Sequence, residues 1–321
     1  MSRVGLVLGG GGITGAAYQL ATLMSLEMAC GWNPNDAEVL IGTSGGAYVA
    51  ALVRSGRLEL DSLVRDGDEH GDVAERIRRH VFVRSPGIRV GRWVRRGLIP
   101  GLRRPGLTML LGSPARHDPA GLAGWVEEQV GEAAAGWPEK ATVIPAYDMG
   151  ARKRVLFGTV DAPDVSLAEA VAASSAIPLV FHPYEIGGRL YVDGGVASGT
   201  HAELVLGASR PLDLVVVIAP MAALEDRDGA WMHERVLDRV GRRSLDDEIE
   251  LIEDAWPECD ILVLRPSPPV LQAMRPNPLA PEAAVPTFIR TLGAMKRKLA
   301  DPDVWNVLDR HLCHGRIRAI G

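Results

Sequence analysis

The sequence predicts an α/β fold, because an apolar strand, a glycine-rich turn and a helix follow one another twice within the first 52 residues. Residues 4–8 are a continuous apolar run, typical of a strand buried on both faces, and the glycine loop 9–15 follows them directly. A helical pattern then covers residues 16–30 and ends at Gly31. Residues 37–52 show the same order, and further strands are predicted over residues 142–147, 154–157, 189–192, 214–219 and 261–264.

Helix signals place most of the remaining elements. Asp118 before Pro119 is a good helix start and predicts a helix that runs to about residue 130. Ser166 and Glu169 have the spacing of a capping box and predict a helix over residues 167–174. Further helices are predicted over residues 245–255, 287–299 and 303–311, with a proline-rich connection over 266–286.

The length and composition indicate one large domain over residues 1–321. The chain has 321 residues, of which 47% are hydrophobic, so it can bury a substantial core. Residues 54–119 are rich in Gly, Pro and Arg and are predicted to form an insertion over that core. Residues 222–321 are predicted to form a C-terminal extension packed on it.

Charge and cysteine content exclude several classes of function. The net charge is −5, from 35 basic and 40 acidic residues, which gives no reason to expect a nucleic-acid partner. Cys30, Cys259 and Cys313 are widely spaced and lack the paired spacing of a zinc site or a disulfide framework, so we expect no metal and no cofactor. The first eight residues run straight into glycines, and no apolar run reaches the roughly 18 residues of a membrane span. We therefore expect a cytoplasmic protein whose membrane contact, if any, is peripheral.

The glycine loop indicates an anion-binding function. Four consecutive glycines, residues 9–12, weaken any regular element and leave bare backbone amides at the start of a helix. Such amides bind a phosphate or an oxyanion. No Gly-Lys-Ser/Thr follows, which excludes a P-loop. The spacing of Gly10, Gly12 and Gly15 fits a dinucleotide fingerprint, but no acidic residue ends the second predicted strand, as that fingerprint requires.

Ser44 lies in the pattern of a nucleophile elbow. Gly42-Thr43-Ser44-Gly45-Gly46 follows a short strand and precedes a helix, which is the context that a catalytic G-x-S-x-G needs. Gly42 and Gly46 meet the demand for small residues where strand and helix nearly touch. The alternative is a chance match in a chain with 36 glycines.

Asp193 ends the strand predicted over residues 189–192 and is followed by Gly194 and Gly195. Because sites in α/β sheets gather at the carboxyl ends of strands, we expect it to lie near Ser44 and the glycine loop. Ser44 would then be the nucleophile and Asp193 the proton acceptor. The amides of Gly10, Gly11 and Gly12 would form the oxyanion hole, helped by Gly45. The alternative for Asp193 is an ordinary Asp-Gly turn.

A basic segment lies within the predicted insertion. Residues 84–104 contain seven arginines and no acidic residue, with Trp93 and several aliphatic residues between them: Arg84, Arg89, Arg92, Arg95, Arg96, Arg103 and Arg104. One interpretation is a surface that contacts anionic lipid headgroups. The other is a solvated basic face.

Taken together, these motifs resemble those of the patatin-like phospholipases, a family of serine acyl hydrolases. The glycine loop 9–15, the G-x-S-x-G element 42–46 and the Asp-Gly-Gly element 193–195 occur in the order of that family. Residues 173–178, Ala-Ser-Ser-Ala-Ile-Pro, are similar to the segment that precedes its catalytic aspartate. The resemblance spans residues 4 to about 205.

The resemblance implies a three-layer α/β/α fold with a mainly parallel sheet and a lipid or ester substrate. It also implies a Ser44–Asp193 dyad, an acyl-enzyme released by water, and a headgroup-facing role for the arginine-rich segment. The remaining motif glycines would support the site: Gly15, Gly42, Gly45, Gly46, Gly194 and Gly195. One position departs from the family, because Thr14 stands where Arg or Lys usually precedes the last glycine of the loop.

Two other interpretations stay open at this point. An α/β-hydrolase triad has the chain order Ser, acid, His, and Asp193 followed by His201 or His233 satisfies that order. A catalytically silent binding protein that keeps the fold is the other, and the replacement at Thr14 is the one feature that suggests it.

Overall fold

The structure is a computed structural model that describes residues 2–58, 70–85, 91, 94–98, 113–224 and 232–313. Of the arginine-rich segment, Arg89, Arg92, Arg103 and Arg104 lie outside the described residues, as does the side chain of Arg96. The side chain of His233 also lies outside them.

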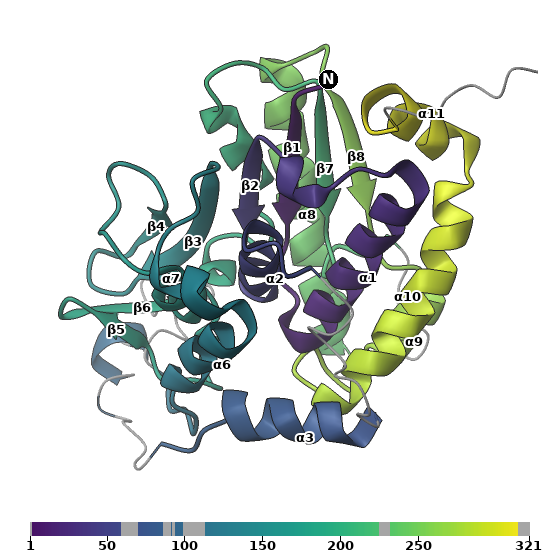
Figure 1. Ribbon diagram of the computed structural model, residues 1–321. Helices are drawn as coiled ribbons and strands as arrows, with labels where there is room; N and C mark the ends of the chain where they lie inside the picture. Colours follow the sequence, from purple (N-terminus) through teal and green to yellow (C-terminus); the bar gives the residue numbers. More distant parts are fainter. Residues whose placement is uncertain are drawn as a thin grey trace, which may run out of the picture.

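A mixed sheet, with eight strands in the described part of the chain, forms the centre of the molecule (Figure 1). The strands follow the order β5-β6-β3-β2-β1-β7-β8, and β4 pairs with β3. Five neighbours, from β3 to β8, run parallel, whereas β4, β5 and β6 are antiparallel to their partners at one edge. Their bounds are β1 Val4–Leu8, β2 Val39–Gly42, β3 Thr142–Asp148, β4 Lys153–Phe157, β5 Tyr184–Ile186, β6 Arg189–Asp193, β7 Leu214–Ile218 and β8 Asp260–Leu264. The mainly parallel sheet implied by the resemblance is confirmed.

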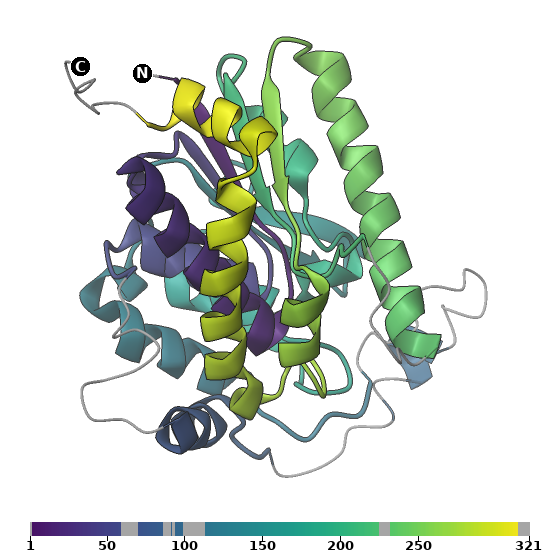
Figure 2. The same cartoon turned by 90° about the vertical axis from the view of Figure 1, so that its right-hand side faces the viewer.

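Helices cover both faces of this sheet, as the three-layer prediction requires (Figure 2). Their bounds are α1 Gly12–Cys30, α2 Gly45–Arg54, α3 His70–Val81, α6 Ala120–Val130, α7 Leu167–Ser174, α8 Met232–Ala255, α9 Pro268–Ala273, α10 Ala284–Leu299 and α11 Pro302–His311. Helix α8 and the short 3-10 helix η7, Ala202–Gly207, lie on one face, and α1, α2, α7 and α10 on the other.

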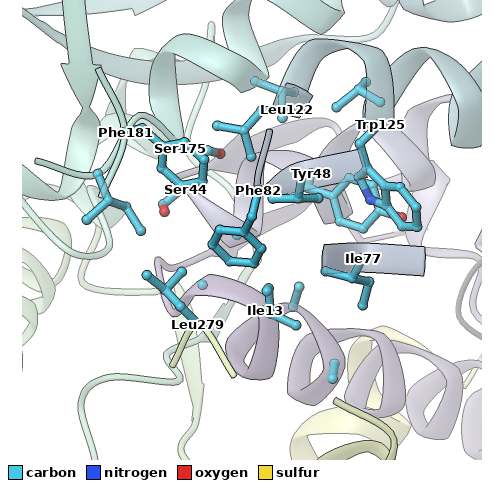
Figure 3. A pocket seen from close by; sticks show the side chains of 18 of the residues that line it. Ile13, Ser44, Tyr48, Ile77, Phe82, Leu122, Trp125, Ser175, Phe181 and Leu279 are labelled. Atoms are coloured by element: carbon cyan, nitrogen blue, oxygen red, sulfur yellow. The ribbon is translucent and has the colours of Figure 1, made fainter. Parts of the chain in front are cut away.

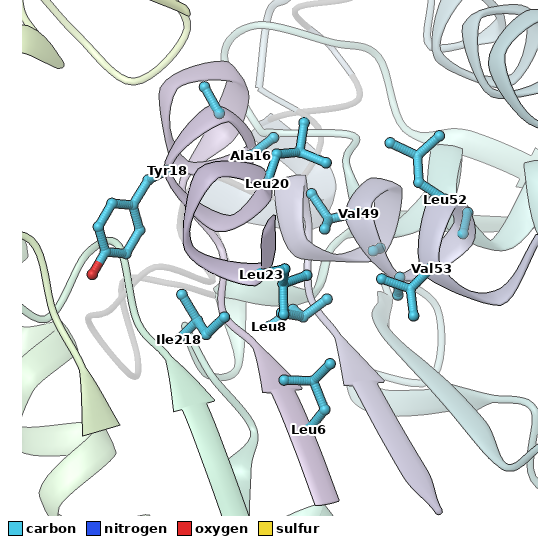
Figure 4. Packing of buried hydrophobic residues seen from close by; sticks show 14 of the residues in the cluster. Leu6, Leu8, Ala16, Tyr18, Leu20, Leu23, Val49, Leu52, Val53 and Ile218 are labelled. Carbon is cyan, nitrogen blue, oxygen red and sulfur yellow. The ribbon is translucent and has the colours of Figure 1, made fainter. Parts of the chain in front are cut away.

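Alternate side chains of the central strands enter two separate cores. Leu6 and Leu8 of β1 point into the larger core, where they meet α1 and α2 (Figure 4). Val7, between them, points to the opposite face and packs with α8 and η7. Each fully buried leucine stabilises the fold by roughly 1.5–3 kcal/mol. A strand buried on both faces must be apolar throughout, which is why β1 and β7 read as continuous apolar runs.

Several element boundaries differ from the sequence prediction, and the largest difference is in α8, which begins at Met232 and not at residue 245. Helix α1 starts at Gly12 and not at residue 16, so its first turn lies inside the glycine loop. Pro119 is the residue before α6 and not its first residue, while the Asp118 carboxylate accepts a hydrogen bond from the Ala120 amide (2.9 Å). The proline-rich connection contains the short helix α9. The capping box of α7 is confirmed, with both reciprocal hydrogen bonds present.

Residues beyond 222 are integral to the sheet and its helical layers. Strand β8 pairs in parallel with β7 over its whole length, and α10 packs along α1 (Figure 2). Within the predicted insertion 54–119, the structure describes α3, which contacts α6 and η8, Pro281–Ala283. In the described residues, no helix is long and apolar enough to span a membrane.

Candidate active site

Ser44 occupies a strained turn between β2 and α2. Its backbone has φ +53° and ψ −121°, a positive φ that a residue with a side chain adopts only when its surroundings enforce it. The Ser44 amide donates a hydrogen bond to Ser174 Oγ (3.0 Å), and that hydroxyl donates to the Pro145 carbonyl (2.7 Å). The geometry is that of the predicted nucleophile elbow.

Close backbone contacts explain the glycines around the elbow. A Cβ atom on Gly46 would lie 2.1 Å from the Leu8 carbonyl oxygen, and one on Gly45 would lie 2.3 Å from the Gly12 carbonyl oxygen. Neither contact is sterically permitted, so only glycine fits at these positions. The elbow therefore lies directly against the glycine loop. Gly42 ends β2 and packs against α2, and Gly15 packs against Pro220 in the first turn of α1.

Asp193 lies within hydrogen-bond distance of the elbow. The Ser44 hydroxyl donates to Asp193 Oδ2 (2.7 Å), and the Gly195 amide donates to Oδ1 (2.7 Å). Gly194, between them, packs against the Pro145 carbonyl. Ser44 is 4% exposed and Asp193 is 5% exposed. Burial raises the pKa of Asp193 from 3.8 to about 6, although its two hydrogen bonds oppose the rise. The carboxyl group therefore changes protonation just below neutral pH.

The meeting of Ser44 and Asp193 has a different geometric cause from the one expected. Strand β6 runs antiparallel to β3. If the two strands lay side by side over their whole length, the carboxyl end of β6 would be at the opposite end of the sheet from the carboxyl ends of the parallel strands. However, β4 occupies one edge of β3 over its second half, and β2 and β6 share the other edge. The Ala141 carbonyl bonds to β2 and the Met149 amide bonds to β6. The backbone groups of every second residue in a strand point to the same edge of that strand, so β2 and β6 lie along the same edge of β3. The ends of β2 and β6 therefore meet head-on along β3.

The glycine loop provides free amides on the other side of Ser44. In the described residues, the amides of Gly11, Gly12 and Gly45 have no protein acceptor. They lie at the N-termini of α1 and α2, where the helix dipoles favour negative charge. The Gly10 amide differs from expectation, because it donates to the Gly199 carbonyl (2.7 Å). The backbone of Gly10 lies against Ser44 instead: a Cβ on it would be 3.6 Å from Ser44 Cβ.

Thr14, the departure from the family pattern, is fully buried. Its amide donates to the Pro278 carbonyl (3.1 Å), and its hydroxyl has no partner among the described residues. The position therefore presents a short polar side chain inside the protein and no cation at the loop.

His201 is fully buried but does not complete a triad with Asp193. Its Nδ1 shares a hydrogen bond with Thr43 Oγ1 (3.1 Å), next to the nucleophile, while the two oxygens of Asp193 are held by Ser44 and Gly195. Burial, with a smaller contribution from Arg154, lowers the pKa of His201 to about 3, so the ring is neutral.

An apolar cavity opens beside Ser44 (Figure 3). Helix α1 contributes Ile13 and Leu20, and α3 covers the cavity with Val73, Ile77 and Val81. The full lining has few polar side chains: Gly12, Ile13, Ala16, Ala17, Leu20, Ser44, Gly45, Tyr48, Val73, Ile77, Val81, Phe82, Leu122, Trp125, Val126, Val171, Ser175, Ile177, Phe181 and Leu279.

Two aromatic side chains line the end of the cavity away from Ser44. Figure 3 shows Trp125 and Tyr48 across the cavity from Ser44 and Ser175. The centroids of the two rings are 6.4 Å apart, and the Arg76 guanidinium lies 5.8 Å from the centroid of Trp125. The cavity thus joins a polar, glycine-lined end to a long apolar interior.

Sequence reasoning missed two contributors to this site. Ser174 fixes the amide of the nucleophile, and its position in the block 173–178 was the available signal. The wall formed by α3 was hidden in the predicted insertion, although Val73, Ile77 and Val81 follow the four-residue spacing of one helix face. In the described residues, no group of His, Cys, Asp or Glu side chains could hold a metal ion.

Comparison with known proteins identifies a family for this chain. The family model for patatin-like phospholipase matches residues 6–206. Among solved structures, the chain is similar to VipD from Legionella pneumophila, with 15% sequence identity and a TM-score of 0.41. The match covers 92% of this chain and 67% of that one. No curated protein sequence matches the chain. Since the family model covers more than half of the residues, the chain belongs to the patatin-like phospholipase family.

Proposed function

We propose that this protein is a lipid acyl hydrolase that cleaves carboxylic esters through an acyl-enzyme on Ser44. Membership of the family supports lipid acyl hydrolase activity in general terms. The observation that carries the proposal is the buried 2.7 Å hydrogen bond from the Ser44 hydroxyl to Asp193, beside an apolar cavity that Ser44 helps to line. In the first step Ser44 Oγ attacks the ester carbonyl carbon and its proton passes to Asp193 Oδ2.

The negative oxygen formed by that attack would be held by the free amides of Gly11, Gly12 and Gly45. Collapse of the tetrahedral intermediate breaks the bond to the alcohol, which takes the proton from Asp193 and departs. Water then attacks the acyl-enzyme while Asp193 accepts one of its protons, and that proton returns to Ser44 as the carboxylic acid is released. Each proton taken up by Asp193 is thus given back within the cycle.

The acyl chain of the substrate would occupy the apolar cavity. Its lining of aliphatic and aromatic side chains excludes a charged headgroup, because burying an unpaired charge there costs several kcal/mol. The headgroup or alcohol would therefore lie on the side of Ser44 away from the apolar cavity. This orientation is compatible with phospholipids, lysophospholipids and simple lipid esters.

A fluorophosphonate probe tests the nucleophile. The proposal expects covalent labelling of Ser44, located by mass spectrometry, and ester hydrolysis that the Ser44→Ala variant lacks. A catalytically silent protein would leave Ser44 unlabelled. Substituting His201 and His233 separately by Ala tests the triad alternative, since a triad loses several orders of magnitude in rate without its histidine, whereas the dyad keeps most of its activity.

We also propose that residues 84–104 bring the protein to anionic lipid surfaces. The support is their composition, with seven arginines and no acidic residue, together with a lipid hydrolase function. The segment follows α3, which lines the cavity, so it lies close in sequence to the site that a lipid would occupy.

A further inference from the structure

A buried glutamate on the opposite face of the sheet holds the loop that follows Asp193. Glu248 of α8 is 6% exposed and accepts hydrogen bonds from three parts of this loop: the Ser198 hydroxyl, the Thr200 hydroxyl (2.5 Å) and the Ala202 amide (2.7 Å). The Ser244 hydroxyl, one turn earlier on α8, also donates to it (3.2 Å). Each oxygen of the Glu248 side chain thus accepts two hydrogen bonds, and hydrogen bonds to a carboxylate are among the strongest in proteins.

The loop held by Glu248 is in contact with both halves of the active site. The Gly199 carbonyl accepts the hydrogen bond of the Gly10 amide (2.7 Å), which sets the direction of the glycine loop next to Ser44. On the other side, His201 Nδ1 bonds Thr43 Oγ1 (3.1 Å), the residue before the nucleophile. The loop therefore joins the glycine loop and the elbow, and Glu248 anchors it at three successive even-numbered residues.

The contacts of Gly10 and Ser198 link this anchor to catalysis. The Gly10 amide is engaged with the loop, so its peptide group is fixed and the next two amides, of Gly11 and Gly12, stay free. Ser198 Oγ also accepts from the amides of Thr200 and His201 (3.2 Å each), so one of the three groups that Glu248 holds also orders the backbone of the turn. Loss of the carboxylate would leave these buried donors unsatisfied and release the loop.

We propose that Glu248 is a positioning residue that sets the geometry of the oxyanion-binding amides through the Ser198–Ala202 turn. This inference rests on the proposed hydrolase function. Glu248 lies outside residues 6–206, the part of the chain matched by the family model, and outside the apolar cavity. Its removal should therefore affect the rate of the chemical step more than the binding of the acyl chain.

The test compares Glu248→Ala and Glu248→Gln with wild type and with Glu250→Gln, an exposed position on the same helix. For each protein, active sites are counted with a fluorophosphonate, and kcat, KM and the rate constant of phosphonylation are measured well below the thermal midpoint. We expect both Glu248 variants to lose about tenfold or more in kcat and in the phosphonylation rate, as when oxyanion stabilisation is weakened. KM should change by less than about twofold, Gln should retain more activity than Ala, and Glu250→Gln should match wild type.

The outcomes separate the two proposals. If wild type neither hydrolyses esters nor becomes labelled at Ser44, the hydrolase proposal fails and this inference fails with it. If wild type is active and the Glu248 variants keep the wild-type kcat per active site while their thermal midpoint falls, Glu248 is purely structural and only this inference is overturned. Should Glu248→Ala not fold, Glu248→Gln and Ser198→Ala decide by the same criteria, since each removes part of the anchor.

Discussion

The two walls of the cavity are built on different principles. One wall, called the sheet edge below, lies at the carboxyl ends of β1 and β2 and contains Gly12, Ser44 and Gly45, with Asp193 hydrogen-bonded to Ser44. Backbone contacts place this wall so tightly that a Cβ on Gly46 would lie 2.1 Å from a carbonyl oxygen. The helical wall, from α3 and α6, presents apolar side chains such as Ile77 and Trp125. One wall fixes atoms within hydrogen-bond distance, whereas the other only fills space.

The polar contacts that attach the helical wall to the rest of the protein are correspondingly weak. Arg78 of α3 pairs with Glu282 (2.9 Å), and His80 lies 3.5 Å from Glu128, with both α3 side chains close to half exposed. Exposed ion pairs contribute about 0–1 kcal/mol each. Most of the stability of α3 in its place therefore comes from burial of Val73, Ile77 and Val81. Under the proposed function, this difference predicts that the sheet edge determines the chemical step and that the helical wall determines which acyl chains are accepted.

The largest effect is expected when the two proposed reacting groups at the sheet edge are removed. Ser44→Ala and Asp193→Asn should each lower kcat/KM for a soluble ester by about 10³-fold or more, because in the proposed mechanism Ser44 is the nucleophile and Asp193 accepts its proton. Steady-state assays with Ile77→Ala as the control for the helical wall measure this, and that control should keep kcat within about tenfold. Turnover in either catalytic variant within tenfold of wild type would contradict the dyad.

The sheet edge was largely predictable from the sequence, because its residues are chemically special. A serine between glycines follows one predicted strand, and an Asp-Gly-Gly follows another. Apart from ordinary turns, few structures require these residues at the end of a strand. The direction of β6 was not predictable, since the pattern of residues 189–192 is the same for a parallel and an antiparallel strand. Likewise, nothing local showed that the Gly10 amide bonds Gly199, which is 189 residues away in the chain.

The pKa of Asp193 makes a second, pH-dependent test of the sheet edge. In the folded protein this pKa is raised from 3.8 to about 6, so the folded state binds the proton more tightly than the unfolded state. The associated stability is present below pH 3.8 and is lost as the pH rises through 6. A difference of about 2 in pKa corresponds to roughly 3 kcal/mol.

Asp193→Asn should therefore be more stable than wild type at pH 8, by on the order of 2–3 kcal/mol, and no more stable at pH 4. Urea denaturation at the two pH values measures the difference. In wild type, kcat/KM should rise with pH along a limb with an apparent pKa near 6, because the ionised carboxylate is the form that accepts the proton. A stability difference that is the same at both pH values would show that burial does not control the ionisation of Asp193.

A smaller effect is expected when the helical wall is changed at the end of the cavity away from Ser44. Trp125→Leu removes ring atoms across the cavity from Ser44 and should extend the longest acyl chain that is accepted by several carbons (Figure 3). Each additional buried methylene contributes about 0.8 kcal/mol, so two of them give roughly tenfold in kcat/KM for the longer ester. Competition between esters of different chain length measures this, while kcat for the preferred wild-type chain should change little.

Trp137→Leu is the matched control, since Trp137 packs against Gly158 and does not line the cavity. An unchanged chain-length profile in Trp125→Leu, or the same change in both variants, would show that this end of the cavity does not limit the acyl chain.

The helical wall was harder to predict because its residues are ordinary. The glycines, prolines and arginines around α3 favoured a loop-rich insertion, and the regular spacing of Val73, Ile77 and Val81 was too short to outweigh them. Glu248 is harder still: within an acidic helix it differs from Glu250 only in what lies opposite it in the folded chain. Burial and partners that are distant in sequence are properties of the fold and leave no local pattern.

The smallest effect is expected on binding to a lipid surface, and it tests the arginine-rich segment that follows α3. Arg95→Gln, at an exposed residue of the arginine-rich segment, should weaken binding to anionic phosphatidylserine vesicles about fivefold, because one basic residue near such a surface contributes about 1 kcal/mol. Vesicle sedimentation measures the binding, and hydrolysis of a short soluble ester should stay unchanged. Lys153→Gln, an equal change of charge on the exposed part of β4, should leave vesicle binding within twofold of wild type. If both variants bind equally well, or if Arg95→Gln loses ester hydrolysis in parallel, the segment does not act as a membrane contact.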